Sequence, residues 1–334
     1  MTLRFAEISS WLTNLFPAGE IRSLSYIESD ASARKYLRCN LNGESYIIMD
    51  TTPGQEQINF AKVAKVFSDN KINAPVIITN DLERGLILMN DFGDQTYLGV
   101  LKRSDPETID RLYLDAIYSL INIQNVAKSA DFAVMDNDYI ANRLDIFKTW
   151  YLQKHLQIEL DSKIDIIIAG LHKIFADAFN ELPQVLVHLD YHCRNLMYVP
   201  HSNMPGILDF QDAMFGPITY DLVSLFQDAY ITWPRQQVEA WVKVYYDLAT
   251  AAGLLDVQNF DVVIRNFDLV GLQRHIKNLG VFARLYHRDN KAAYLNHVPT
   301  LLTYIMDTCN RYDELADLRA YLTDNVLENA DMLL

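Results

Sequence analysis

The fold can be predicted from residues 185–209, VLVHLDYHCRNLMYVPHSNMPGILD. The apolar runs at the start of this stretch, around Met197 and around Ile207 are typical of short strands, and a polar loop and a Pro205-Gly206 turn separate them. Four polar residues stand at the ends of these runs, namely His188, Asp190, Asn195 and Asp209. Polar side chains gathered at strand ends indicate a functional site.

The order of these residues, His-x-Asp-x-x-x-x-Asn followed by a later Asp, matches the spacing in enzymes that transfer phosphoryl groups. In such enzymes the protein holds the phosphoryl donor, the metal and the acceptor hydroxyl in line, because the transition state needs little covalent help. A carboxylate and an amide supply the oxygen ligands that Mg²⁺ prefers. A further carboxylate, free of metal, can accept the proton of the acceptor hydroxyl.

Two alternatives to a kinase-like site remain for these residues. Asp, Asn and His are common in turns, where their side chains bond to nearby backbone, so any one of them alone is more often structural. A zinc site built from His188, Asp190 and His192 is the other chemical interpretation. It needs a further ligand, and no Cys/His pair supplies one at the usual spacing.

Hydrophobic periodicity divides the chain into a strand-rich front and a helix-rich remainder, with the change between Asn90 and Gly93. The predicted strands are 21–28, 35–41, 45–50, 75–80 and 86–90, with a helix after Pro53-Gly54. The predicted later helices are 106–127, 139–156, 162–180, 220–230, 236–252, 258–285 and 311–323. We therefore expect an α+β, protein-kinase-like bilobal fold, with a small antiparallel-sheet lobe that binds nucleotide at residues 1–90 and a larger helical, catalytic and substrate-binding lobe at 91–334.

Charge and cysteine content exclude several classes of protein. The 334 residues include 29 Lys and Arg and 43 Asp and Glu, and the net charge of −14 divides as −2 over residues 1–93 and −12 over residues 94–334. Without a basic run, nucleic acid is excluded as a partner. Three cysteines without C-x-x-C spacing give neither a disulfide framework nor a zinc ribbon. We expect a cytoplasmic protein with no membrane segment and no obligate protein partner.

Two segments carry a resemblance to a known family. HLDYHCRN (188–195) and ILDFQDAMFGPITYDLVSL (207–225) resemble the active loop of the aminoglycoside phosphotransferase and choline kinase superfamily. LMNDFGDQTYL (88–98) and GLQRHIKNLGVFARL (271–285) are similar to a narrower branch, the anomeric sugar kinases of cell-wall recycling. The resemblance implies ATP and Mg²⁺ as cofactors and a small-molecule sugar as substrate.

Carried over residue by residue, the resemblance makes Asp190 the catalytic base and Asn195 and Asp209 the Mg²⁺ ligands. His188 would brace the backbone of the loop. Backbone groups at Met89, Asn90 and Asp91 would pair with the edge of the adenine ring.

The phosphate-binding part departs from the usual kinase pattern. The third strand carries Met49 where a kinase places the lysine that binds the α- and β-phosphates. The preceding loop contains no glycine, so small residues such as Ser29 and Ser32 must let the backbone amides approach the phosphates. We hypothesise that Arg34 or Lys35 supplies the missing cation. The alternative is that both are solvated strand residues.

The acceptor site is marked by basic residues on the last long predicted helix. Arg274, Lys277 and Arg284 are candidate donors to an anionic lactyl group or a polar acetamido group, although a solvated helix face is the usual explanation of such residues. Asp190 itself, together with Asp94 and Asp212, is expected to flank the acceptor.

We therefore expect an ATP-dependent phosphotransferase that phosphorylates the anomeric C1 hydroxyl of N-acetylmuramate, N-acetylglucosamine or both, as the resemblance implies. One alternative is another small-molecule kinase of the superfamily, with an aminoglycoside, choline or homoserine acceptor. The acidity of the helical lobe favours it, because acidic clefts attract cationic acceptors. A non-catalytic pseudokinase is suggested by Met49, and a metal-dependent hydrolase would use the HLDYH segment.

Overall fold

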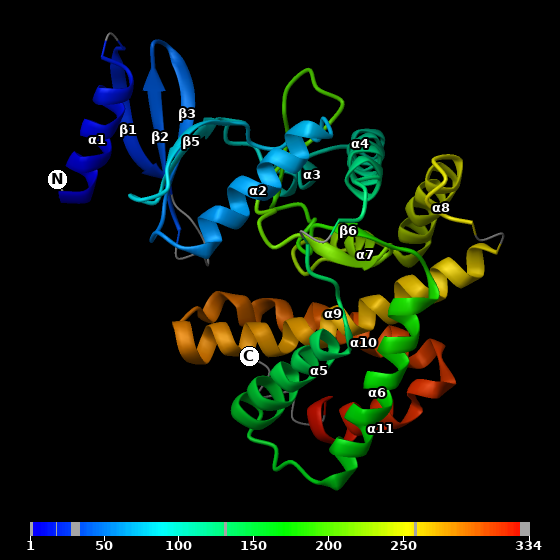
Figure 1. The fold of residues 1–334 in the computed structure, drawn as a ribbon. Helices are drawn as coiled ribbons and strands as arrows, with labels where there is room; N and C mark the ends of the chain where they lie inside the picture. The colour runs from blue at the N-terminus through cyan, green and yellow to red at the C-terminus, as the bar shows by residue number, and fades with distance from the viewer. Residues whose placement is uncertain (1–2, 18, 28–33, 130–131, 257–258, 328–334) are drawn as a thin grey trace. The chain divides into compact units, whose positions relative to one another are not determined.

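The computed structural model describes residues 3–17, 19–27, 34–129, 132–256 and 259–327 (Figure 1). The chain divides into two compact units. The first unit combines Met1–Thr96 with Leu196–Asp212, and the second combines Tyr97–Asn195 with Ala213–Leu334. The functional boundary near residue 90 stays a prediction.

The first unit is built on a five-stranded antiparallel sheet with the strand order β1-β2-β3-β5-β4. All five predicted strands are present. Their bounds are β1 (Ile21–Ile27), β2 (Lys35–Leu41), β3 (Glu44–Asp50), β4 (Ile77–Asp81) and β5 (Leu86–Asn90), and the helices of this unit are α1 (Leu3–Leu15) and α2 (Gln55–Asp69). Figure 1 shows α1 along one side of the sheet and α2 along the other.

Alternation along the central strands separates two faces of this sheet. Leu37, Ile48 and Leu88 oppose one another on β2, β3 and β5 and are completely buried in a cluster with Ile8 and Leu12 of α1. Complete burial of such side chains stabilises the fold by about 1.5–3 kcal/mol each. Odd-numbered residues of β2 therefore face α1, and even-numbered residues face the opposite side.

The segment Leu196–Asp212 packs on the α2 side of the first unit. The Phe210 ring lies 4.7 Å from that of Phe60 and 5.2 Å from that of Phe67, both on α2. At Gly206 a Cβ would stand 2.6 Å from the Phe92 ring, so only glycine allows this close approach. Short strands β7 (Leu196–Met197) and β8 (Gly206–Ile207) pair within the segment. Asp209 is thereby anchored to the first unit.

The second unit is mainly helical, as predicted. Its helices are α3 (Tyr97–Leu101), α4 (Pro106–Gln124), α5 (Asn137–Ile146), the π-helix η1 (Phe147–His155), α6 (Ser162–Glu181), α7 (Tyr220–Phe226), α8 (Arg235–Ala251), α9 (Phe260–Asp289), α10 (Val298–Arg311) and α11 (Ala316–Leu322), with η2 (Ala292–His297), η3 (Asp313–Leu315) and η4 (Thr323–Leu327) as short turns. Strands β6 (Gln184–Val187) and β9 (Met214–Pro217) pair antiparallel. Asp105, Asp136 and Asp161 cap α4, α5 and α6 by accepting from backbone N–H groups, which fixes where these helices begin.

Helix α9 is the central element of the second unit, and it packs against η1, α10, α6, α5 and α7. At Gly280 the backbones of two elements come into contact, because a Cβ there would stand 2.6 Å from the carbonyl group of Ile146 and 2.7 Å from Cα of Phe147. The glycine therefore lets α9 lie directly on the junction between α5 and η1.

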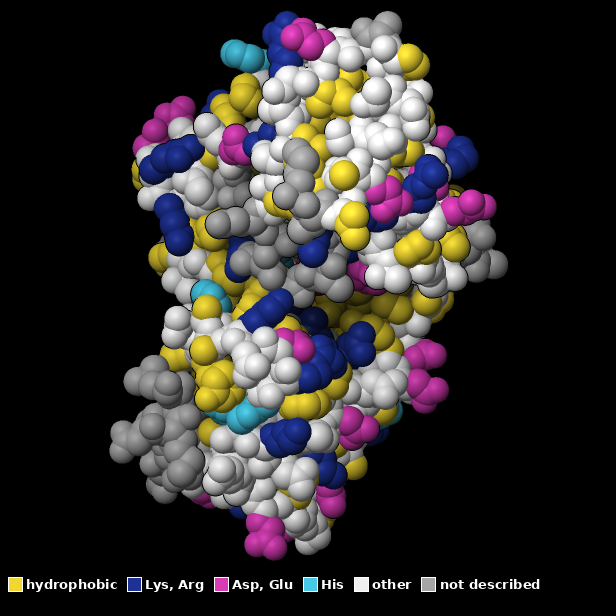
Figure 2. All heavy atoms as spheres, turned by 90° about the vertical axis from the view of Figure 1, so that its left-hand side faces the viewer, with side chains coloured by type: hydrophobic (Ala, Val, Ile, Leu, Met, Phe, Trp, Pro, Cys, Tyr) yellow, Lys and Arg dark blue, Asp and Glu magenta, His cyan; other side chains and the backbone are white. Residues whose placement is uncertain are grey.

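Three helices were not predicted, namely α1, α3 and α10. The residues of α10 have a strongly one-sided apolar pattern, with Leu301, Leu302 and Ile305 buried. Charged side chains of both signs are interspersed over the surface shown in Figure 2. Among the described residues, no helix is both long and apolar enough to cross a membrane.

Candidate active site

The loop after β6 carries the predicted catalytic Asp190 in the second unit. Its backbone enters the left-handed region at Leu189, where φ is +80°. The Asp221 carboxylate, at the start of α7, accepts the N–H groups of His188 and Leu189 at 2.6 and 3.0 Å. Burial raises the pKa of Asp221 to about 6, while the His188 imidazole and these two N–H groups favour its charged form. Asp221 thus holds a strained backbone in place directly before Asp190 in the chain.

The carboxylate of Asp190 is held by an arginine from α9. Arg274 Nη2 donates to Asp190 Oδ1 at 3.2 Å, and Arg274 Nε donates to Ser224 Oγ at 2.7 Å. The Arg274 side chain is 4% exposed and that of Asp190 is 46% exposed. Partial desolvation opposes the charge on Asp190, yet Lys277 and Arg274 outweigh it and hold the pKa of this carboxyl below its usual range. The carboxylate is therefore ionised at neutral pH and still open on one side.

His188 and Asn195 fix the backbone on either side of Asp190. Asp190 N–H donates to His188 Nδ1 at 3.3 Å, and Asn195 Nδ2 donates to the backbone oxygen of Asp190 at 3.0 Å. Because Nδ2 is the donor, the amide oxygen of Asn195 points elsewhere, and it has no protein partner in the described part of the chain. An amide oxygen of this kind fits the chemistry of a Mg²⁺ ligand.

Arg34 occupies a special position in the first unit. It is buried, its Nη2 lies 2.7 Å from Asp209 Oδ1, and its Nε lies 3.1 Å from Glu56 Oε1 of α2. Arg34 precedes Tyr36, which is opposite Met49 across β2 and β3, so Arg34 shares a sheet face with the position where a kinase lysine would stand. Arg34 therefore joins the start of β2, α2 and Asp209 on one face.

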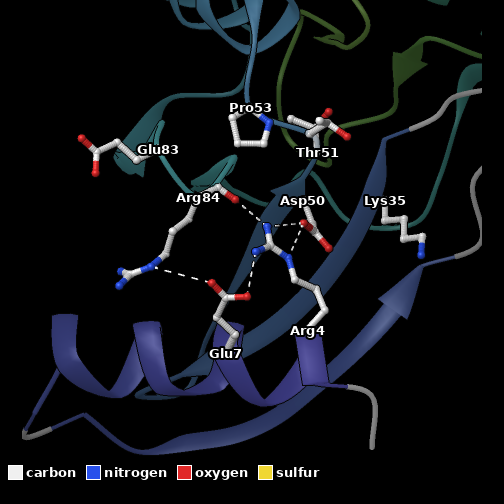
Figure 3. A pocket seen from close by; sticks show the side chains of 9 residues that line it. Arg4, Glu7, Lys35, Asp50, Thr51, Pro53, Glu83 and Arg84 are labelled. Carbon is white, nitrogen blue, oxygen red and sulfur yellow. Dashed lines mark hydrogen bonds and ion pairs between the residues drawn. The ribbon is translucent and has the colours of Figure 1, made fainter.

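Lys35 lies on the opposite face. It is opposite Asp50 in the sheet register, beside a pocket of about 430 Å³ that Arg4, Glu7, Thr51, Pro53 and Arg84 help to line (Figure 3). In this pocket the Arg4 guanidinium donates to Asp50 and Glu7 and so ties α1 to the end of β3. Lys35 has no ion pair among the described residues. Of the two basic residues proposed for the phosphates, only Arg34 points toward Asp209.

The predicted adenine-binding stretch ends in a polar cluster. Arg38 donates to both Asp91 oxygens at 2.6 and 3.1 Å and also bonds to Asp94. Arg38 and Ser45 favour the charged form of Asp91 and, against burial, hold its pKa below the ordinary value. The N–H of Asn90 already donates to Val76 at 3.3 Å. Backbone recognition of adenine at Met89, Asn90 and Asp91 stays a prediction.

The remaining candidates are placed as follows. Asp212 is exposed and accepts from Gln211 Nε2 at 2.9 Å. Met49 is completely buried in the sheet. Ser29 and Ser32 lie outside the described residues. Within the described ranges no three His, Cys, Asp or Glu side chains are arranged to hold a metal ion, so the zinc alternative at HLDYH finds no support.

Comparison with known proteins decides the family. The model of the phosphotransferase enzyme family matches residues 23–254, which is more than half of the chain. This chain belongs to the phosphotransferase enzyme family. The predicted superfamily and the α+β, kinase-like fold class are confirmed. The prediction of an enzyme is confirmed as well, and its phosphoryl donor is a nucleotide.

Curated relatives of the phosphotransferase cover nearly its whole length. A protein of Pseudomonas putida named N-acetylmuramate/N-acetylglucosamine kinase is 38% identical over 329 residues, which are 95% of this chain and 95% of the relative. A protein of Pseudomonas aeruginosa with the same name is 37% identical over 325 residues, covering 94% and 95%. A protein of Neisseria meningitidis, also so named, is 35% identical over 326 residues, covering 97% and 96%.

Solved structures share the fold at much lower identity. Choline kinase LicA from Streptococcus pneumoniae superposes with a TM-score of 0.64 at 12% identity, covering 92% of this chain and 100% of that one. An aminoglycoside phosphotransferase, APH(2'')-Ib with bound ADP, superposes with a TM-score of 0.61 at 17% identity, covering 91% and 98%. These similarities concern the fold.

Two residues of the site were not nominated from the sequence. Glu56 was overlooked because an acidic residue in the first turn of a helix is explained by the helix dipole. Ser224 was part of the quoted motif, yet nothing in its spacing indicates that it orients Arg274. Both act through partners more than 20 residues away in sequence, which no local pattern shows.

Proposed function

We propose that the phosphotransferase transfers the γ-phosphoryl group of ATP to the anomeric C1 hydroxyl of N-acetylmuramate or N-acetylglucosamine, sugars of the bacterial cell wall. The supporting observation is the 35–38% identity, over nearly the full length, to three kinases named for these sugars. The arrangement at Asp190 supplies the chemistry that this reaction needs.

Asp190 orients the acceptor hydroxyl and takes its proton. The hydroxyl oxygen forms a bond to the γ-phosphorus while the bond to the bridging oxygen of the leaving ADP breaks, and the hydroxyl proton passes to Asp190. Because Lys277 and Arg274 keep Asp190 ionised, it binds the hydroxyl as an acceptor before transfer. Transfer of the proton then comes late, when the hydroxyl oxygen has become acidic.

Asn195 and Asp209 are our proposed Mg²⁺ ligands, through the amide oxygen of one and the carboxylate of the other. When bound, Mg²⁺ neutralises the charge on the phosphate oxygens. Arg34 is the proposed replacement for the missing third-strand lysine, because it combines a permanent charge with contacts to α2 and to Asp209. Its ion pair with Glu56 corresponds to the lysine–glutamate pair that protein kinases require.

A cationic acceptor is disfavoured by the surroundings of Asp190. Arg274 and Lys277 both act on this carboxylate, so the charge near the acceptor hydroxyl is positive although the unit as a whole is acidic. Aminoglycosides and choline are cations and would be repelled there. The local charge thus supports a neutral or anionic sugar.

The test is ADP release by the purified chain with N-acetylmuramate, N-acetylglucosamine, an aminoglycoside and choline as acceptors, with ³¹P detection of a sugar 1-phosphate. We expect turnover with one or both sugars and a loss of roughly 10²–10⁴-fold in kcat for Asp190→Asn. Asp177→Asn, which alters an exposed carboxylate paired with Lys173 on α6, is the matched control. Turnover only with a cationic acceptor would overturn the proposal.

A further inference from the structure

Three basic residues on α5 and α9 lack a counter-ion among the described residues. Arg143 on α5 and Lys277 and Arg284 on α9 form no ion pair with any of the described residues, in contrast to most buried or half-buried basic groups. The Nε of Arg284 is buried and has no hydrogen-bond partner in the described part of the chain. We call Arg143, Lys277 and Arg284 the cation cluster.

Helix geometry puts the two α9 members of the cluster on the face that carries Arg274. At 100° per residue, positions 274, 277 and 284 fall within about 80° of one another, and Lys277 is one turn from Arg274. Arg274 is bonded to Asp190. The cluster therefore begins beside the proposed catalytic base and extends along α9.

A chain of ring contacts connects Arg143 to the same place. The Arg143 guanidinium lies 4.3 Å from the centre of the Tyr139 ring, and Tyr139 Oη lies 3.3 Å from Tyr220 Oη. The Arg274 guanidinium lies 5.9 Å from the centre of the Tyr220 ring. Gly280 allows α9 to touch the end of α5, so Arg143 is brought toward Lys277 by backbone packing as well.

Electrostatic effects within the cluster agree with this placement. The pKa of Lys277 is lowered to about 7, mainly by burial and then by the charges of Arg274, Arg143 and Arg284, while Asp190 opposes this lowering. Burial, with Arg288 and Arg143, also lowers the pKa of Arg284. The carboxylate with a leading influence on the pKa of Lys277 is Asp190, which already has an ion pair with Arg274.

Uncompensated and partly desolvated positive charge costs folding free energy, and an anion that enters the cluster removes this cost. We propose that the cation cluster binds an anionic substituent of the acceptor, a carboxylate carried on the sugar, and so selects acidic over neutral sugars. This inference rests on the proposed function. N-Acetylmuramate carries a lactyl carboxylate, whereas N-acetylglucosamine carries a hydroxyl in its place, so the cluster selects N-acetylmuramate.

The experiment compares three acceptors that differ in this one group: N-acetylmuramate, its lactyl methyl ester and N-acetylglucosamine. For the wild-type chain we expect kcat/KM for N-acetylmuramate to exceed that for the ester by at least about tenfold, as a charge-assisted contact provides. Lys277→Met keeps most of the length of the side chain and removes its charge. It should bring the ratio between acid and ester close to one.

Two further variants serve as a second test and as a control. Arg143→Gln removes a second member of the cluster from a different helix and should lower the same ratio. It provides the test if Lys277→Met fails to fold. Arg265→Met removes an exposed arginine of α9 that pairs with Glu314, and it should keep the wild-type ratio. A ratio near one for the wild-type chain overturns the inference. So does a ratio that is as high in Lys277→Met and Arg143→Gln as in the control Arg265→Met.

Failure of the proposed function gives a different result. If neither sugar is phosphorylated, calorimetric titration of the intact chain with N-acetylmuramate and with its methyl ester tests the cluster by itself. Tighter binding of the acid, lost in Lys277→Met, supports the anion site in the absence of turnover. Equal binding of acid and ester contradicts it.

Discussion

The two units differ in how completely their arginines are paired with carboxylates. In the first unit every arginine has at least one carboxylate partner: Arg4 with Asp50 and Glu7, Arg22 with Glu20, Arg34 with Glu56 and Asp209, Arg38 with Asp91 and Asp94, and Arg84 with Asp81. In the second unit several arginines are also paired with carboxylates, namely Arg235, Arg265, Arg274, Arg288 and Arg311, whereas the three members of the cation cluster have no ion pair among the described residues.

This difference separates cations that build structure from cations that await a ligand. A paired arginine fixes the elements it connects, and its charge is already neutralised. The charge of an unpaired, partly buried cation is not neutralised, and it lowers the free energy of unfolding until an anion binds. Residues 94–334, which carry the larger excess of acid, nevertheless include the cation cluster. Net charge is thus a poor guide to the ligand.

Replacing Arg34 tests whether an arginine that is paired with carboxylates also binds the phosphates of the nucleotide. For Arg34→Met we expect the KM for ATP to rise by at least about tenfold and kcat to fall by a similar factor, because the cation nearest Asp209 is lost. Steady-state kinetics at saturating sugar measures both. The variant Arg34→Lys should recover part of the loss, as a point charge without the two-pronged geometry.

The competing hypothesis is tested by Lys35→Met. Lys35 faces the α1 side of the sheet, so we expect less than about a twofold change in either constant. A large effect at Lys35 with a small one at Arg34 would show that the phosphates are bound on the α1 side of the sheet and not on the side of Arg34.

Replacing Arg274 tests the pairing in the second unit. The guanidinium lowers the pKa of Asp190, so Arg274→Met should raise that pKa, and the acid limb of kcat/KM should move to higher pH. At pH 7 we expect a loss of about tenfold in kcat, since Asp190 is also held less firmly. The pH profile is the decisive measurement, because a purely structural role would lower the rate without moving the limb. Arg274→Lys should restore most of the profile.

Replacing Arg4 tests a structural ion pair at the surface. Arg4 is partly exposed and bonds to Asp50 and Glu7, so Arg4→Met should lower the free energy of unfolding by about 1 kcal/mol or less. Urea denaturation measures this change. Sugar kinase activity at 25 °C should stay near the wild-type value, and a tenfold loss would mean that the pocket beside Lys35 takes part in catalysis.

The sequence was sufficient to predict the sheet and the position of the loop that carries Asp190, since both have local signals. Alternation marks strands such as 35–41 and 45–50, and the spacing from His188 to Asn195 is carried within eight residues. Helix α1 (Leu3–Leu15) was not predicted. Its Ile8, Trp11 and Leu12 are buried against the sheet and do follow helical spacing.

Partners of the site residues could not be predicted in this way. The sequence offered Arg34 and Lys35 as equals, and only the strand register with Met49 and Asp50 separates them. A contact of Arg274 with the sugar stays a prediction, and the sequence did not indicate its protein partners, Asp190, 84 residues away, and Ser224. Such contacts depend on how distant elements pack, which composition and periodicity do not encode.

The first unit is discontinuous in sequence, and this affects how it can form during synthesis. Its five strands and two helices are complete by Asn90, yet Phe210, which packs on Phe60 and Phe67, belongs to a segment that the ribosome makes only after Tyr97–Asn195. At a synthesis rate of about 5–20 residues per second, several seconds pass before Phe210 is made, and during this time the rings of Phe60 and Phe67 on α2 are not covered by it. The chain therefore cannot finish its first unit before most of the catalytic loop has left the ribosome, and premature termination before residue 210 leaves both units incomplete.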